Sequence, residues 1–269
     1  MRGTLDSVIG QTHRDVEHIV VDGNSADHTR DLLAEYGPRY QAVGKVLRWI
    51  SEPDRGVYDA MNKGIAMATG EVIGLLNSDD FYTSANVLRR VADEVRDVDA
   101  VYADIHYVDP SDLSRCVRYY SSRDFSRQKM RLGFMPAHPS FYCRRSIYQN
   151  YGCFDLDFKV AADFEQLFRL IYIHDIAIRY IDADFVTMRI GGASTSGLSS
   201  HKQILRDHQL AYAKNIPDRP FAARPLRCLN GVVNMTLDVS RYLPKLIGLL
   251  RDKLLRPQQT SAEATLTSR

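Results

Sequence analysis

The sequence predicts an α/β fold, in which a mostly parallel sheet is flanked by helices and followed by a helical tail. Two observations lead to this prediction. Short apolar runs typical of strands alternate along the chain with segments of helical spacing. The clearest run, residues 72–76 (VIGLL), is continuous, as in a parallel strand buried on both faces, and carboxylates follow it directly. Ligands of open α/β sheets lie beyond the carboxyl ends of strands, so we expect a ligand site there.

The first elements alternate regularly. Residues 4–10 suit a helix, and residues 18–21 form a short strand that ends in the turn Gly23-Asn24-Ser25. Residues 27–36 suit a second helix, and residues 46–50 a second strand.

A third helix begins near Tyr58, because Met61, Ile65 and Ala68 recur on one helical face. Gly70 is expected to end this helix in a left-handed conformation, just before the apolar strand.

The second half continues the alternation. Residues 85–96 suit a helix, residues 100–108 a strand and residues 123–133 a helix or loop. Residues 160–171 place their apolar positions on one helical face, and residues 178–188 form a final strand.

Composition indicates one catalytic domain and a tail, because the 269 residues are 45% apolar and 25% charged. The four cysteines (Cys116, Cys143, Cys153 and Cys228) have neither metal-ligand spacing nor a disulfide pattern, which indicates reduced thiols. No signal peptide opens the sequence, and no run of about 18 apolar residues interrupts it. We expect a cytoplasmic protein, at most peripheral to the inner membrane.

We divide the chain into a catalytic domain (1–199), a helical extension (200–256) and a disordered tail (257–269). From residue 201 onward, 12 Lys and Arg residues stand against 5 Asp and Glu residues, so the extension is basic. Its second helix either packs on the domain or in a dimer, or attaches to an anionic membrane surface. Five apolar residues share one face of this helix, and five basic residues flank them: Leu243, Leu246, Ile247, Leu250 and Leu254; Arg241, Lys245, Arg251, Lys253 and Arg256.

Six ordered segments resemble the family 2 glycosyltransferases, an inverting family with the Rossmann-like GT-A fold. The resemblance implies a GT-A sheet, a nucleotide-sugar donor and a divalent cation, Mg²⁺ or Mn²⁺. The segments are HIVVDGNSADHT (18–29), SEPDRGVYDAMNKGIAMATGEVIGLLNSDD (51–80), AVYADIHYVD (100–109), HPSFYCRRSIYQNYGCFD (138–155), AADFEQLFRL (161–170) and GGAS (191–194).

The family's acidic DXD motif corresponds to the residues after the 72–76 strand. The resemblance makes Asp79 and Asp80 the metal and ribose ligands, and Asn77 stands where many relatives carry a carboxylate. A cation bound by carboxylates and phosphates would neutralise the nucleoside diphosphate as it leaves the sugar. The structural alternative is a capping cluster for the next helix.

Further residues are implied around the nucleotide. Asp22 resembles the acidic residue that contacts uracil or ribose, although an Asx-turn would also explain it. Asp54 and Arg55 lie on the nucleotide loop, and Asn62 and Lys63 would face the diphosphate.

Asp163 is the implied general base, because AADFE resembles the family's acidic motif at a helix start beside the acceptor. Relatives commonly carry an acid before it, where this chain has Ala162, and Glu165 is the weaker alternative. An ordinary acid at a helix N-terminus is the other interpretation. His138 could contact metal or phosphate on the acceptor side, and Arg189 could pair with the diphosphate.

One element of the family pattern is missing. Family members open with an apolar strand in the middle of the sheet, whereas this chain opens with a helix. We expect the strands beside that position to have unpaired edges. Either the natural start lies upstream of Met1, which we favour, or this version of the chain is damaged.

The implied function is inverting transfer of a sugar, from a UDP-sugar as the expected donor, to a glycan or lipid-linked acceptor in cell-surface polysaccharide biosynthesis. No nucleic-acid partner is expected. A nucleotidyltransferase would share the nucleotide-binding sheet, but it should show a Gly-rich, basic phosphate loop near the N-terminus, and the sequence has none. A noncatalytic relative that retains the scaffold is the third interpretation.

Overall fold

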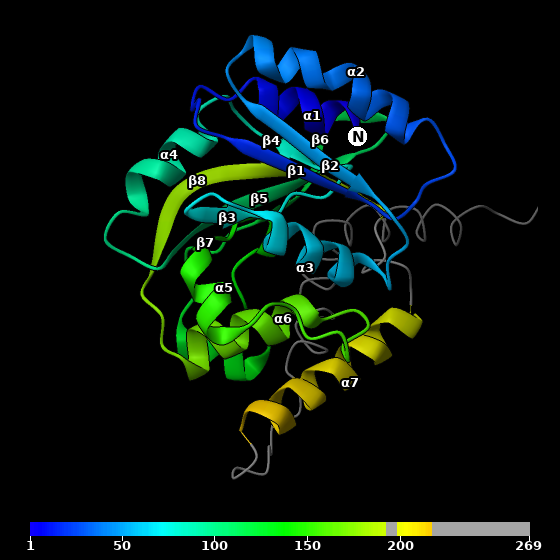
Figure 1. Cartoon of the computed structure of the whole chain (residues 1–269). Helices are drawn as coiled ribbons and strands as arrows, with labels where there is room; N and C mark the ends of the chain where they lie inside the picture. Colours follow the sequence, from blue (N-terminus) through cyan, green and yellow to red (C-terminus); the bar gives the residue numbers. More distant parts are fainter. Residues whose placement is uncertain (192–197, 217–269) are drawn as a thin grey trace, which may run out of the picture. The chain divides into compact units, whose positions relative to one another are not determined.

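The computed structural model of the chain describes residues 1–191 and 198–216, which belong to one compact unit, Met1–Pro225 (Figure 1). A second unit, Leu226–Arg269, lies outside the described residues. The predictions for the amphipathic helix and for the tail at 257–269 fall there. In the part that is described, no helix is long and apolar enough to span a bilayer.

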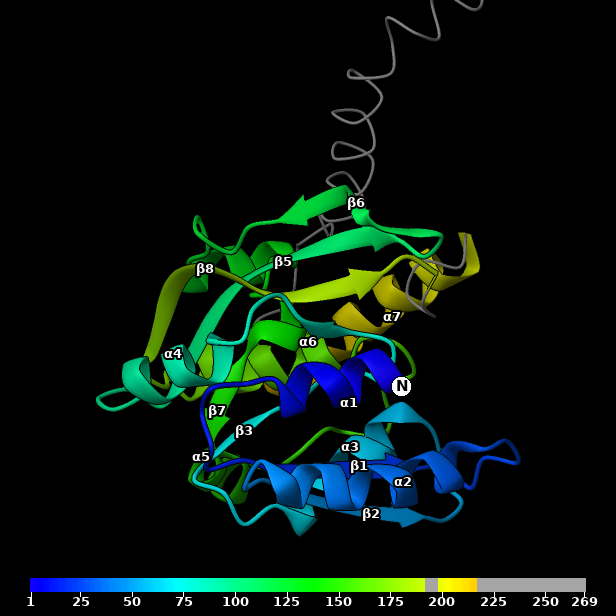
Figure 2. The same cartoon turned by 90° about the horizontal axis from the view of Figure 1, so that it is seen from above.

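The first part of the fold is a parallel pair of strands (Figure 2). β1 (Glu17–Asp22) pairs with β2 (Val46–Ser51) along the whole length of both strands. The helices of this part are α1 (Arg2–Ile9), α2 (Thr29–Ala42) and α3 (Val57–Met67). Apolar side chains of α1, β1 and α2 share one core cluster, formed by Leu5, Val8, Val20, Leu33, Tyr36 and Tyr40.

The second part is a six-stranded sheet in the order β3-β7-β5-β8-β4, with β6 beside β5. β5 and β8 pair in parallel, whereas the other four pairings are antiparallel. The strands are β3 (Val72–Gly74), β4 (Phe81–Tyr82), β5 (Ala100–Asp109), β6 (Asp112–Tyr120), β7 (Tyr142–Arg144) and β8 (Ile178–Arg189).

The predicted α/β class is confirmed, but a mostly parallel sheet is wrong for the described residues. A short connection explains one of the four antiparallel pairings, that of β5 with β6. Asp109 ends β5 and pairs with Asp112, the first residue of β6. A turn this short joins only antiparallel neighbours, because parallel strands need a long crossover.

Helices of the second half surround a separate aromatic core. Phe164 and Phe168 stack with ring centroids 5.8 Å apart, and Tyr212 meets Phe168 edge-on at 5.0 Å. The helices of this core are α5 (Arg145–Tyr151), α6 (Ala162–Leu167) and α7 (Leu198–Asn215), with 3₁₀ helices at Arg127–Leu132 and His138–Ser140. Helix α4 (Val87–Glu94) packs in another cluster, with β5 and β8. A π-helix at Phe168–Ile173 continues α6, so the helix predicted at 160–171 exists but changes its hydrogen bonding after Leu167.

The expected left-handed stop at Gly70 is wrong. α3 ends at Met67, Ala68 is extended (φ −66°, ψ 132°), and Gly70 has no positive φ. The next free amide, that of Thr69, donates to the Glu17 carboxylate at 2.8 Å. A side chain of β1 therefore satisfies the backbone after this helix, and no glycine cap is needed.

β1 and β3 each pair with one strand only, as far as residues 1–191 and 198–216 show. Thr4 Oγ1 at the start of α1 donates to the Ser78 carbonyl beyond β3 (2.7 Å). Near the end of α1, the Ile9 carbonyl accepts from Lys45 Nζ, just before β2 (2.8 Å). α1 thus runs from the carboxyl end of β3 to the amino end of β2. The central strand expected between β1 and β3 stays a prediction.

β3 is shorter than predicted. The apolar run 72–76 forms a strand only at Val72–Gly74, and only Ile73 in that strand is buried. β3 pairs with β7 alone, over three residues, and Leu75 and Leu76 lie outside that pairing.

Candidate functional site

A tight acidic turn, residues 77–80, follows β3. The Asp80 amide donates to the Asn77 carbonyl (3.1 Å), and Asn77 Nδ2 donates to Asp80 Oδ2 (2.9 Å). Asp80 is 1% exposed, whereas Asp79 faces solvent. β4 starts at the next residue and pairs with β8, so this acidic turn is held against the second sheet.

The environment of Asp80 suits a cation. Burial raises the pKa of Asp80 to about 6; the Asp79 charge acts in the same direction and the Asn77 hydrogen bond opposes both. A divalent cation would compensate the desolvated charge, and Asp79 and the Asn77 carbonyl offer further oxygen ligands. In residues 1–191 and 198–216, no three His, Cys, Asp or Glu side chains form a metal-binding group. A metal at this turn would therefore also need substrate phosphates as ligands, as is usual for Mg²⁺.

Arg189 reaches the same turn from the end of β8. Its Nη1 donates to the Asp79 carbonyl, and its guanidinium lies 5.0 Å from the centre of the Phe81 ring. The Met1 amine is also near: burial and Arg189 lower the pKa of this amine, and Asp79 raises it. The structure thus places the predicted phosphate partner Arg189 beside the predicted metal ligands, with its orientation fixed by the aromatic ring.

Asp22 is the last residue of β1, and Asp54 lies on the loop after β2. Asp22 is buried and accepts hydrogen bonds from the Ser25 amide (3.1 Å), the Ser25 hydroxyl (2.5 Å) and the Ser51 hydroxyl (2.6 Å). Burial opposes ionisation, but these hydrogen bonds hold the pKa of Asp22 below its usual value. The Asx-turn interpretation of Asp22 therefore has a structural basis.

Asp54 joins the two loops. Its Oδ1 accepts from the Gly56 amide (2.8 Å), and a Cβ on Gly23 would come within 2.7 Å of Oδ2. Only glycine leaves room for this close approach. Asp54 therefore shapes the loop where the resemblance places the nucleotide.

Asn62 and Lys63 bind protein groups instead of an open site. Asn62 donates to the Phe154 carbonyl and accepts from the Phe154 amide, both at 2.9 Å. Lys63 Nζ donates to the Pro53 carbonyl (2.8 Å) and pairs with Glu52 (2.7 Å). Asn62 therefore clamps α3 to the 154 loop, and Lys63 fixes the loop after β2.

Asp163 lies on the first turn of α6, half-buried, as predicted. Its charge acts on His138, whose pKa burial lowers, and on Tyr58, whose pKa burial raises. Glu165 is buried and held by Arg169 in a bidentate pair (2.9 and 3.2 Å). Of these two carboxylates, Glu165 is neutralised by Arg169, and Asp163 is the more exposed.

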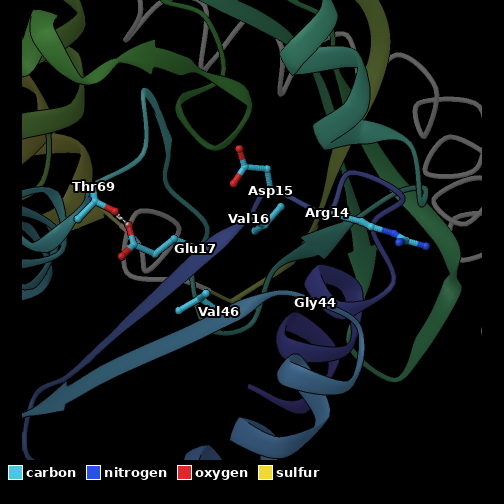
Figure 3. Close-up of a pocket in the computed structure, with 7 residues that line it drawn as sticks. All are labelled: Arg14, Asp15, Val16, Glu17, Gly44, Val46 and Thr69. Carbon is cyan, nitrogen blue, oxygen red and sulfur yellow. Dashed lines mark hydrogen bonds between the residues drawn. The ribbon is translucent and has the colours of Figure 1, made fainter.

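A pocket of about 440 Å³ lies away from these acids (Figure 3). It opens at the amino ends of β1 and β2, where Glu17 accepts from the amide and hydroxyl of Thr69 at 2.8 and 3.0 Å. Its lining residues are Arg14, Asp15, Val16, Glu17, Gly44, Val46 and Thr69. Ligands of α/β sheets bind at the opposite, carboxyl ends, so we assign the candidate site to the acidic turn.

A polar network on β5, β6 and β8, which includes the buried Asp104, is absent from the sequence prediction. His106 Nδ1 lies 2.6 Å from Asp184 Oδ2, and Asp104 accepts from the hydroxyls of Tyr119 (2.9 Å) and Tyr180 (3.0 Å). The partners are up to 78 residues apart, and only the strand register brings them together.

Asp80→Asn should stabilise the protein at neutral pH by about 1–3 kcal/mol. The folded-state pKa of Asp80 lies above the unfolded value, so wild-type stability falls as pH rises through about 4 to 6. The variant should therefore unfold at a higher temperature at pH 7.5 and at an equal temperature near pH 4. Exposed Asp79→Asn is the control and should show little change. Equal effects of both variants, or no pH dependence, would contradict the role of burial.

Asn62→Ala should lower the free energy of unfolding by about 1–3 kcal/mol, because two backbone groups of Phe154 lose their partner. Nucleoside-diphosphate affinity should stay unchanged in calorimetric titration. Lys63→Ala, which removes a surface pair, is the matched control and should cost less than about 1 kcal/mol. Loss of nucleotide affinity with unchanged stability would restore the ligand role for Asn62.

Residues 1–152 match the family model Glycosyl transferase family 2. A PGL/p-HBAD biosynthesis glycosyltransferase of Mycobacterium bovis (strain BCG / Pasteur 1173P2) is 31% identical over 180 residues, covering 66% of each chain. An uncharacterised glycosyltransferase of Mycobacterium tuberculosis (strain CDC 1551 / Oshkosh) is 30% identical over 207 residues, covering 76% of this chain and 73% of the relative. The chain thus spans 66% of the length of the first relative.

A solved structure with the same fold is the mannosyltransferase PcManGT from Pyrobaculum calidifontis in complex with GDP-Man and Mn²⁺. Its TM-score is 0.59 at 19% identity, covering 84% of this chain and 62% of that one. S. aureus TarS 1–349 in complex with UDP-GlcNAc also has a TM-score of 0.59, at 18% identity, covering 81% and 64%. The GT-A prediction is confirmed by these likenesses. Since the family match covers more than half of the 269 residues, the chain belongs to glycosyl transferase family 2.

Proposed function

We propose that the chain is the catalytic part of an inverting hexosyltransferase. The donor is a nucleotide sugar, UDP-linked in our proposal, and the acceptor is a hydroxyl of a glycan or lipid-linked intermediate of cell-surface polysaccharide biosynthesis. The observation that carries the proposal is the acidic turn, where buried Asp80, exposed Asp79 and Arg189 meet beyond the carboxyl end of β3. Support for a nucleotide-sugar donor comes from the TarS and PcManGT complexes.

The chemistry divides between two groups of residues. Asp79 and Asp80 would hold Mg²⁺ or Mn²⁺, whose charge stabilises the departing diphosphate, and Arg189 offers a second positive charge to it. Asp163 would take the proton of the acceptor hydroxyl while the oxygen of that hydroxyl attacks the anomeric carbon. The bond to the diphosphate breaks on the opposite face, so the configuration inverts. A general base of this kind contributes roughly 10²- to 10⁴-fold.

A noncatalytic relative is the second candidate, and the unpaired edges of β1 and β3 favour it.

We propose a different explanation of these edges, in which an extended segment preceding Met1 pairs between β1 and β3. α1 runs opposite to β1, so such a segment would lie parallel to β1, as in a right-handed β-α-β unit. Contact with an anionic inner membrane surface, or dimerisation, is a further proposal that rests on the sequence of residues 241–256.

Titration of UDP into the upstream-extended chain, with and without Mn²⁺, tests the donor site. We expect metal-dependent binding that Asp80→Ala abolishes. Asp163→Asn should bind UDP within about 3-fold of wild type while losing roughly 10²- to 10⁴-fold in transfer. Equal loss of binding in Asp163→Asn would make that residue structural. A folded wild type that binds GDP or dTDP but not UDP would overturn the UDP assignment.

Extension of the chain by its natural upstream residues should stabilise it by several kcal/mol. A central strand of about five residues forms up to about ten backbone hydrogen bonds, each contributing roughly 0.5–1.5 kcal/mol. Amide hydrogen exchange in β1 and β3 should slow together. The matched control is the same extension with two prolines, which cannot donate to either neighbour. Unchanged exchange in both strands would contradict pairing and favour the noncatalytic candidate.

A further inference from the structure

Side chains from two distant elements hold the backbone directly before Asp163. The amides of Val160 and Ala161 both donate to Oδ2 of Asp207, at 2.8 and 3.0 Å. From the other side, the Tyr58 hydroxyl donates to the Val160 carbonyl. Three backbone groups are therefore fixed by α7 and α3, which approach α6 as Figure 1 shows.

Asp207 binds the backbone directly before α6, at Val160 and at the N-cap residue Ala161. The N-cap of α6 is Ala161, and no side-chain hydrogen bond caps it from within the segment. Asp207 is 3% exposed, and its Oδ1 accepts from Gln203 Nε2 at 2.7 Å. A buried carboxylate with three donors has a fixed position and can transmit it to the amides that it binds.

α7 has further attachments that do not involve Asp207. The His208 ring stacks on Phe164 with centroids 3.9 Å apart, and Asn215 donates to Glu165 at 3.2 Å. The Tyr212 hydroxyl donates to the Met130 carbonyl at 2.8 Å. Loss of the Asp207 carboxylate alone should therefore leave α7 in place and release only the segment before Asp163.

We propose that Asp207 is a positioning residue that sets where the Asp163 carboxylate meets the acceptor. The inference rests on the proposed role of Asp163 as general base. Tyr58 completes the arrangement, because α3 leads directly into β3 and the acidic turn. The base and the donor side are thus joined through one pair of backbone residues, and a shift of about 1 Å in a reacting group can cost about 100-fold in rate.

The test compares Asp207→Ala and Asp207→Asn with Gln203→Ala in the upstream-extended chain. Activity is UDP release from UDP-glucose, UDP-galactose or UDP-GlcNAc at saturating acceptor. Asp207→Ala should lower kcat about 10- to 100-fold, with UDP–Mn²⁺ affinity within 2-fold of wild type. Asp207→Asn keeps an acceptor oxygen and should regain most of kcat. Gln203→Ala leaves the Val160 and Ala161 contacts intact and should change kcat less than 3-fold.

Combination with Asp163→Asn separates positioning from general stability. If Asp207 acts through Asp163, adding Asp207→Ala to Asp163→Asn should cause no further loss of kcat. Hydrogen exchange should show faster exchange of the Val160 and Ala161 amides in Asp207→Ala, with α7 still protected.

Two results would overturn the proposal. One is a wild-type kcat for Asp207→Ala, when kcat is calculated per molecule that binds UDP. The other is a double variant whose loss of kcat equals the combined losses of the two single variants. Failure of the proposed function looks different. In that case wild type does not bind or use nucleotide, or Asp163→Asn keeps wild-type kcat. Amide exchange at Val160 and Ala161 then still decides whether Asp207 holds the segment, and unchanged exchange there would reject its positioning role.

Discussion

The pairing of β8 with β4 is the constraint on which the candidate site depends. This pairing places Phe81 opposite Thr187 directly after the acidic turn. Two residues beyond Thr187, Arg189 reaches the Asp79 carbonyl. A shift of β8 by one residue would turn Arg189 to the other face of the sheet and separate it from Asp79, because side chains alternate along a strand. The geometry of the acidic turn is thus set by a strand that lies about a hundred residues later in the chain.

Asp22 at the end of β1 and Asp80 beyond β3 differ in how the protein compensates their charge. Asp22 receives three hydrogen bonds, and its pKa is held low without any cation. Asp80 receives one side-chain hydrogen bond, from Asn77, and burial raises its pKa to about 6. The first carboxylate is already compensated by the protein, whereas the second still requires positive charge. The uncompensated burial of Asp80 is compatible with a cation ligand, and the hydrogen bonds of Asp22 give it a structural role in the loop.

The sequence predicted those features that depend on local spacing. Helix α1, strand β2 and the position of Asp163 on the first turn of α6 follow from periodicity within about ten residues. Local spacing did not reveal the hydrogen bonds of Asn62, because its partner Phe154 is 92 residues away in the sequence. β6 was missed because most of its residues are exposed, so it lacks the alternation of a half-buried strand.

The unpaired edges bear directly on the acidic turn. α1 begins beside that turn, because the Thr4 hydroxyl donates a hydrogen bond to the Ser78 carbonyl and the charge of Asp79 raises the pKa of the Met1 amine. A strand that paired between β1 and β3 would therefore deliver the loop joining it to α1 next to Asp79. If nucleotide contacts that loop only in the paired state, ligand binding and strand pairing stabilise each other by the same free energy. Loss of the strand would then weaken donor binding with every acid still in place, so intact carboxylates alone do not ensure an active enzyme.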